Sequence, residues 1–93
     1  MEKTNRRHQA KMDDIEKGCV DVQQMLMYRL SEKGNGIYVS SHETFGIIKE
    51  EFDELSDAVK RNDKRDIERE LLDIAVGALF GYISSKTNKQ DWP

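Results

Sequence analysis

The stretch from Leu71 to Ile83 constrains the fold more than any other part of the sequence, because as a helix it is apolar on nearly every face. Asp73 is the only charged residue within it. A helix that is apolar nearly all round must be buried nearly all round. A chain of 93 residues has few other elements to enclose such a helix, so we expect a partner chain to supply part of the cover.

Charge and cysteine content limit the partners and the compartment. Acidic residues outnumber basic ones by 18 to 15 and the isoelectric point is near 5.4, so we expect no nucleic-acid partner that would be bound through its phosphates. A single cysteine, Cys19, excludes an internal disulfide, and no signal peptide is recognisable, so we expect a cytoplasmic protein. No apolar run reaches the roughly 18 residues of a membrane-spanning helix, so we expect no membrane partner.

Hydrophobic periodicity predicts a first helix that ends before the glycines at 34 and 36, followed by a short extended connection over 37–39. Residues 1–11 offer nothing to pack and are expected to fray. Apolar residues recur at spacings of three and four, which places them on one stripe of this helix. They are Met12, Ile15, Cys19, Val22, Leu26 and Leu30.

Two further helices follow, separated by a turn at 62–63. Ser40 and Glu43 have the spacing of a capping box, which predicts the start of the second helix. Its expected seam consists of Phe45, Ile48, Phe52, Leu55 and Val59. Asp63 is the expected cap of the third helix, and residues 86–93 are expected to form a tail. The sequence therefore predicts one all-α domain over residues 1–93, an antiparallel helical bundle completed by oligomerisation.

Two pairs of carboxylates flank the expected turn. Glu51 and Glu54 are three residues apart on the second helix, and Glu70 and Asp73 are three apart on the third, so each pair shares a helix face. If the helices are antiparallel around 62–63, residues at equal distance from the turn face each other. The four carboxylates can then converge.

Four converging carboxylates suit a hard divalent cation, because Mg²⁺ prefers oxygen ligands and Mn²⁺ can replace it. Gly77 lies one turn after Asp73 on the same side, where we expect it to leave space for a ligand. The sequence has no Glu-x-x-His pair, which argues against a di-iron centre.

Two simpler interpretations stay open. Glu50, Glu51 and Glu54 taken alone are typical of a solvated helix face. Asp73 could be held by a buried ion pair with an arginine or a lysine, because a carboxylate in an apolar run needs a partner.

The segment 50–54, EEFDE, followed after fifteen residues by the segment 70–73, ELLD, resembles the EExxE and ExxD motifs of the MazG-like all-alpha nucleoside triphosphate pyrophosphohydrolases. The resemblance covers roughly residues 40 to 85. That superfamily includes dimeric dUTPases, dCTP pyrophosphatases and phosphoribosyl-ATP pyrophosphohydrolases. The resemblance implies a MazG-like helical bundle whose active site is commonly built by more than one subunit, so a homodimer or homotetramer is expected.

The resemblance also implies an activity: Mg²⁺-dependent hydrolysis of a nucleoside or deoxynucleoside triphosphate between the α and β phosphates, giving the monophosphate and pyrophosphate. Carried over by position, the metal ligands would be Glu51, Glu54, Glu70 and Asp73, with Mn²⁺ as a possible substitute for Mg²⁺. Glu50, Glu51 or Glu54 would orient or deprotonate the attacking water.

The cations that would meet the substrate phosphates are not singled out by any motif. Lys49, His42 and Arg69 are the candidates closest to the acidic segments. The alternative from a different class is a non-catalytic helical oligomerisation module, in which the acidic cluster is only a structural charge network.

Overall fold

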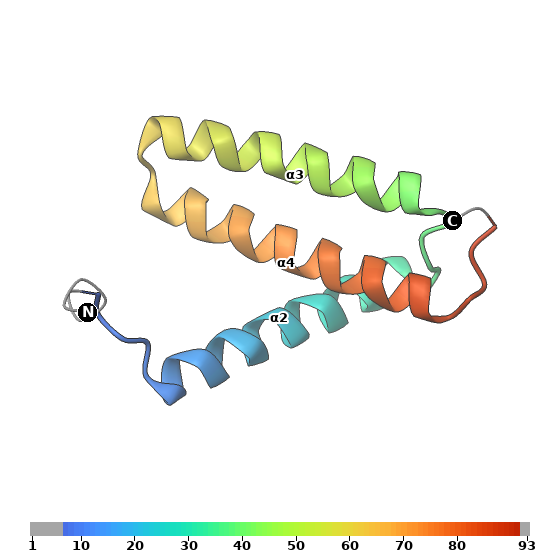
Figure 1. Ribbon diagram of the computed structural model, residues 1–93, viewed down its shortest axis with the longest axis horizontal. Helices are drawn as coiled ribbons and strands as arrows, with labels where there is room; N and C mark the ends of the chain where they lie inside the picture. The colour runs from blue at the N-terminus through green and yellow to red at the C-terminus, as the bar shows by residue number, and fades with distance from the viewer. Residues whose placement is uncertain (1–6, 92–93) are drawn as a thin grey trace.

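The computed structural model describes residues 7–91, and in that range the chain forms three helices and no strand. These are α2 (Met12–Lys33), α3 (Ser41–Arg61) and α4 (Lys64–Lys86). Helices α3 and α4 lie side by side as an antiparallel hairpin, and α2 crosses α4 obliquely (Figure 1). The prediction of an all-helical fold is confirmed. Residues 1–6 of the segment expected to fray, and residues 92–93 of the expected tail, lie outside the described residues.

The helix boundaries follow the sequence signals. The backbone N–H of Gly34, at φ +87°, donates to the carbonyl of Leu30 at 2.7 Å and ends α2. The hydroxyl of Ser40 accepts from the N–H of Glu43 at 3.2 Å, which confirms the predicted start of α3. The Glu43 carboxylate accepts in return from the N–H of Val39, one residue before the position that a capping box predicts.

The turn between α3 and α4 occupies two residues. Asn62 adopts a left-handed conformation with φ 56°, which an asparagine tolerates and which ends α3. Asp63 then accepts a hydrogen bond from the N–H of Asp66 at 3.1 Å and caps α4, as predicted. So short a turn forces the two helices to run antiparallel in close contact.

Glycines of α4 determine where the hairpin contact lies. A Cβ at Gly81 would stand 2.4 Å from Cγ2 of Thr44, so the helices approach too closely there for a side chain. A Cβ at Gly77 would meet Ile47 and Ile48 at 3.7 and 4.0 Å. These are ordinary contact distances, so a methyl group would fit at Gly77, and the expectation that this glycine leaves room for a ligand stays a prediction.

The predicted seam of α3 is only partly correct. Ile48 and Leu55 are half-buried, whereas Phe45, Phe52 and Val59 are 68%, 59% and 54% exposed. The close approach at the glycines of α4 centres the contact on a neighbouring row of α3, so these three residues face outward. We call the surface that they form with Leu71 and Tyr82 of α4, which are 50% and 63% exposed, the apolar face.

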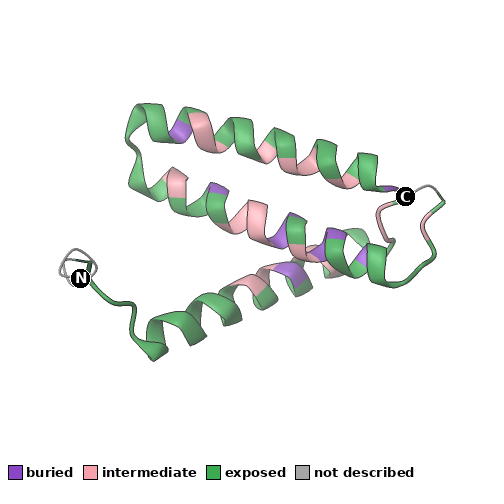
Figure 2. Ribbon diagram, viewed as in Figure 1, coloured by how far each residue is buried: buried purple, intermediate pink, exposed green. Residues whose placement is uncertain are grey.

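Only the C-terminal half of α2 packs against the rest of the chain. Leu26 forms a small core with Val76 and Phe80 of α4, with 7%, 3% and 8% exposure. The N-terminal half of the predicted stripe is exposed, including Met12, Cys19 and Ile15. Figure 2 shows this contrast, with buried residues gathered where α2 crosses α4.

The connection between α2 and α3 covers one end of the hairpin. The N–H of Tyr38 donates to the hydroxyl of the fully buried Ser84 at 3.1 Å, and its ring meets that of Phe80 edge to face at 5.1 Å. Residues after α4 return to the same connection: the side-chain amide of Gln90 donates to the carbonyl of Tyr38, and the N–H of Asp91 donates to that of Val39, both at 2.9 Å.

A single chain is less compact than is usual for a folded domain of 93 residues. Its radius of gyration is 15.9 Å, whereas a compact domain of this length has a value of about 12 Å. Its accessible surface is 7691 Å², against about 5500 Å² for a folded monomer of the same mass. No helix within residues 7–91 is long and apolar enough to cross a membrane.

We expect Gly81→Ala to lower the free energy of unfolding by about 1 kcal/mol, because the clash with Thr44 outweighs the gain in helix propensity. Gly46→Ala is the matched control: nothing lies within 4 Å of its Cβ position, so it should stabilise by about 0.5–1 kcal/mol. Urea unfolding followed by circular dichroism measures both changes. Thr44→Ser should partly rescue Gly81→Ala, and a stabilising Gly81→Ala would contradict the close contact.

Candidate metal centre

Three carboxylates from the two hairpin helices meet at one point. Glu51 of α3, with Glu70 and Asp73 of α4, each offers one oxygen, and these oxygens all lie within 4.8 Å of one another. They meet because the helices are antiparallel and the residues are at similar distances from the turn. Glu70 is buried with 7% exposure, and its Oε1 has no hydrogen-bond partner. We call this group the carboxylate cluster.

Glu54 and Glu50 lie beside the carboxylate cluster without belonging to it. Glu54 is one turn further along α3 than Glu51 and lies close enough to Glu51 and Glu70 to raise the pKa of both. Glu50 is exposed and borders a cavity next to Glu51. The structure therefore brings Glu51, Glu70 and Asp73 together most closely, with Glu54 in contact at the edge.

Two carboxyl groups of the carboxylate cluster have raised pKa values, because burial and neighbouring carboxylates disfavour their ionised forms. Burial, the hydrogen bond with Glu54 and repulsion by Asp73 raise the pKa of Glu51 to about 7. Burial and the hydrogen bond with Glu54 also raise the pKa of Glu70, although the nearby guanidinium of Arg69 opposes the rise. Carboxyl groups with raised pKa values are typical of sites that a cation occupies or that carry out proton transfer.

Asp73 has a cationic partner on α2, the helix outside the hairpin. Nη2 of Arg29, on α2, forms a salt bridge with Oδ1 of Asp73, whose side chain is 16% exposed. This is the ion pair that the sequence left open as an alternative. Arg29 forms a salt bridge with only one of the three carboxylates, however, so the pair does not account for the unpartnered oxygen of Glu70 or for the raised pKa of Glu51.

A cavity of about 440 Å³ adjoins the carboxylate cluster, between the C-terminal half of α2 and the hairpin. Leu26, Ile47 and Phe80 give it apolar walls. Arg29 and Lys33 of α2 supply positive charge, and Glu50 and Glu51 line the side toward the carboxylate cluster. A ligand with an apolar part and an anionic part would match these walls, provided that a cation lies between its anionic part and the carboxylates.

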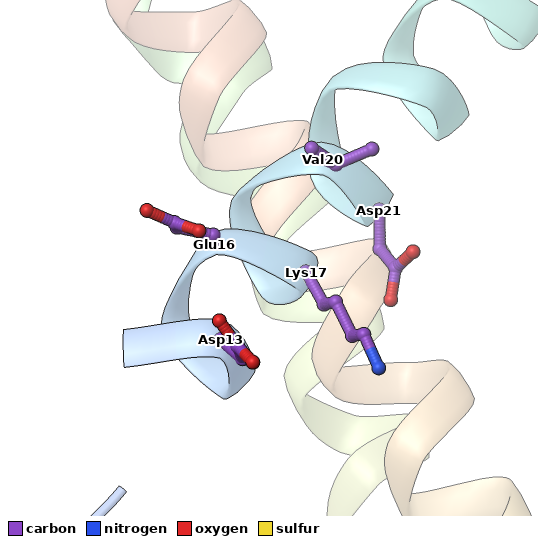
Figure 3. A pocket seen from close by; sticks show the side chains of 5 residues that line it. All are labelled: Asp13, Glu16, Lys17, Val20 and Asp21. Carbon is purple, nitrogen blue, oxygen red and sulfur yellow. The ribbon is translucent and has the colours of Figure 1, made fainter. Parts of the chain in front are cut away.

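A second hollow, of about 320 Å³, runs along the N-terminal half of α2 (Figure 3). Its lining residues all belong to that one helix, so no other element closes it. They are Asp13, Glu16, Lys17, Val20 and Asp21. Because these carboxylates do not converge, this hollow is a poorer candidate for a metal site than the carboxylate cluster.

The phosphate-binding candidates named from the sequence have mixed positions. Lys49 faces Asp53 at 3.7 Å on the exposed side of α3, and His42 is exposed in the first turn of that helix. Neither lines the cavity beside the carboxylate cluster. Arg69 lies next to the carboxylate cluster, with its Nε 3.9 Å from Oε2 of Glu70. Its Nη2 lies 3.0 Å from Oδ1 of Asp66.

The two cations of α2 that line the cavity were not predicted from the sequence. Arg29 is seven residues after Val22, so it continues the stripe that packs on α4, and Lys33 follows one turn later. A charged residue on an apolar helical stripe is the signal that could have identified Arg29. Its partner could not have been named, because the pair joins residues that are 44 positions apart.

In the presence of a chelator, we expect the free energy of unfolding to fall as pH rises from 4.5 to about 7. The raised pKa of Glu51 means that the folded state binds its proton more tightly than the unfolded state, so removing that proton destabilises the fold. Urea midpoints at pH 5, 6, 7 and 8 measure the slope. Glu51→Gln should flatten it, whereas Asp53→Asn, on the exposed side of α3, should not. Equal slopes for wild type and Glu51→Gln would contradict the assigned shift.

The chain is similar to one family of known proteins. The MazG nucleotide pyrophosphohydrolase domain family matches residues 40–89, which is more than half of the chain and includes all of α3 and α4. No curated protein and no solved structure matches the chain. The matched segment contains every member of the carboxylate cluster. The chain belongs to the MazG nucleotide pyrophosphohydrolase domain family.

Proposed function

We propose that this protein hydrolyses a nucleoside or deoxynucleoside triphosphate to the monophosphate and pyrophosphate. Membership of the MazG family supports the reaction class. The observation that carries the proposal is the carboxylate cluster, with the unpartnered buried oxygen of Glu70, placed at the edge of a cavity that also contains Arg29 and Lys33.

The donor set fits a hard divalent cation such as Mg²⁺, or Mn²⁺ in its place. Glu51, Glu70 and Asp73 would supply carboxylate oxygens, and Glu54 would join them through its contacts with Glu51 and Glu70. When bound, the cation would neutralise the triphosphate and increase the acidity of a bound water. The carboxylates are on two rigid helices, which is the arrangement that holds reacting groups in a constant geometry.

In the proposed reaction, a water oxygen forms a bond to the α phosphorus and the bond from that phosphorus to the bridging oxygen breaks. Pyrophosphate leaves with the electron pair of the broken bond. Glu50 is the best placed of the acidic residues to accept the proton of the water, because it borders the cavity, is exposed and lies outside the carboxylate cluster.

One observation favours the alternative of a non-catalytic helical module: the ion pair of Arg29 with Asp73. In that case the acidic residues would form a structural charge network and would bind no cation. The two functions differ in a direct measurement, since only the first requires Mn²⁺ or Mg²⁺ to bind at the carboxylate cluster.

The decisive experiment measures pyrophosphate release from a panel of canonical, deoxy and modified nucleoside triphosphates, with Mg²⁺, with Mn²⁺ and with chelator. Release that requires the metal and that Asp73→Asn lacks would establish the reaction and its substrate class. No release from any nucleotide, by a folded protein that also binds no Mn²⁺, would support the structural module instead.

We expect Glu54→Gln to lower metal-dependent turnover by at least about a hundredfold, because it removes one charge that would hold the cation. Circular dichroism should show an unchanged helical content, since Glu54 is exposed. Asp53→Asn is the matched control, one position away and paired with Lys49 outside the carboxylate cluster, and should keep wild-type turnover. Survival of turnover in Glu54→Gln would remove Glu54 from the metal ligands.

We further propose that the MazG-like bundle is completed by a second copy of the chain seated on the apolar face. The accessible surface exceeds that of a compact monomer by about 2000 Å². A standard protein interface buries about 800 Å² of each partner. The apolar face can supply part of such an area, because its large side chains are half or more exposed. Phe45, Phe52 and Tyr82 are large, exposed and on one side of the hairpin, as expected of interface anchors.

We expect Phe52→Glu to shift the protein from oligomer to monomer, because a charge at the centre of the apolar face would be buried unpaired in the dimer. Size-exclusion chromatography with light scattering measures the mass. Met27→Glu is the matched control: Met27 is equally exposed, at 59%, but belongs to α2. Dissociation by Met27→Glu and not by Phe52→Glu would place the interface on α2 instead.

A further inference from the structure

Arg29 is placed to bind either of two anionic groups: Asp73 of the chain, or an anionic ligand in the cavity. Its guanidinium binds Asp73 of the carboxylate cluster, and the same side chain lines the cavity beside that cluster. It is 34% exposed, so rotation about its side-chain bonds can carry the guanidinium toward the cavity without any movement of α2.

Arg29 and a divalent cation would compete for Asp73. Both are positive, and two cations held by the same carboxylate group repel each other. The carboxylate cluster attracts a divalent cation through three carboxylates, whereas Arg29 contacts only Asp73. A bound divalent cation would therefore displace Arg29 from Asp73.

Released from Asp73, the guanidinium needs a new anionic partner. The other charged residues that line the cavity are Lys33, which repels it, and three carboxylates. Of these, Glu51 is itself in the carboxylate cluster, Glu43 already accepts a hydrogen bond from a backbone N–H, and Glu50 is exposed to solvent. A phosphate group that enters with the cation matches the planar, forked donor geometry of arginine.

We propose that Arg29 exchanges partners during ligand binding: it neutralises Asp73 in the metal-free protein and binds phosphate oxygens of the substrate in the cation-loaded protein. This inference rests on the proposed function. It makes Arg29 a phosphate-binding residue and also a competitor of the metal. A single substitution should consequently change the two affinities in opposite directions, which a merely structural ion pair would not do.

The test uses Arg29→Met, which removes the charge and keeps much of the apolar stem. Isothermal titration with Mn²⁺ alone should show about tenfold tighter binding than wild type, because the competing cation is gone. Titration of inorganic triphosphate as its Mn²⁺ complex, into protein already saturated with Mn²⁺, should show at least about tenfold weaker binding, because a charged hydrogen bond is lost. Inorganic triphosphate makes the result independent of the base that the site prefers.

Two further variants keep the test sharp. Arg61→Met removes an arginine whose partner, Asp66, lies outside the carboxylate cluster, and both affinities should stay at wild-type values. Arg29→Lys keeps the charge but loses the fork, so Mn²⁺ affinity should stay within about twofold of wild type while triphosphate binding weakens. Circular dichroism establishes that each variant is folded.

The outcomes separate the inference from the proposed function. If wild type binds Mn²⁺ and releases pyrophosphate while Arg29→Met and Arg29→Lys both bind Mn²⁺ less tightly, the partner exchange is wrong and the proposed function stands. If Arg29→Met changes neither affinity, the exchange is likewise wrong. If wild type binds no Mn²⁺ and hydrolyses no nucleotide, the proposed function fails and the exchange fails with it.

Discussion

The rest of the structure depends on how ionisable carboxylates are accommodated on a helix that is otherwise apolar. Glu70 and Asp73 lie where α4 contacts the other two helices, and α3 adds Glu51 to the same point. Burial and mutual repulsion disfavour the fully ionised cluster, as the raised pKa of Glu51 shows. The chain offers Arg29 to one carboxylate and leaves an oxygen of Glu70 without a partner. Such a concentration of unfavourable charge is typical of a site shaped for a ligand rather than for stability.

The hairpin of α3 and α4 gives this cluster its geometry. The two-residue turn, which consists of the C-cap of α3 and the N-cap of α4, sets the register of the two helices. The close approach at Gly81 sets their separation. Neither feature includes a member of the carboxylate cluster, yet together they decide which carboxylates face each other. Because the cluster is built on helices and not on loops, its members are held by packing along the whole hairpin.

Much of the fold followed from local signals, and most of the disagreement concerns contacts between helices. The caps at Ser40 and Asp63 were predicted because capping depends on residues only three positions apart. The rotation of α3 was not, because it depends on where α4 has glycines, and a periodic row of apolar residues does not show which of its members meet a neighbour. Phe45 and Phe52 are the clearest examples.

Of the candidate site, the part on the hairpin was predicted from the sequence, whereas the part on α2 was not. Counting from the turn of an antiparallel hairpin predicted that four carboxylates could meet, with Glu54 opposite Glu70 and Asp73. The structure brings Glu51 closest to Glu70 and Asp73 instead, because the rotation of α3 is not given by counting. Arg29 belongs to α2, which is not joined to the hairpin by a short turn, so counting residues predicts neither the partner of Arg29 nor its place in the cavity.

The small core explains why a site of this kind suits an assembly better than an isolated chain. Leu26, Val76 and Phe80 are the main contacts that hold α2 against α4, and half of α2 has no partner within the described residues. Helix α2 supplies both cavity-lining cations, so its position decides where a phosphate could be bound. A second copy on the apolar face would stabilise the hairpin, and a bound cation would relieve repulsion within it, each by an amount that grows with the logarithm of its free concentration once that exceeds the dissociation constant. Stability and cation binding are then coupled through the hairpin, because a cation that binds the ionised carboxylates would also remove the repulsion that destabilises the fold.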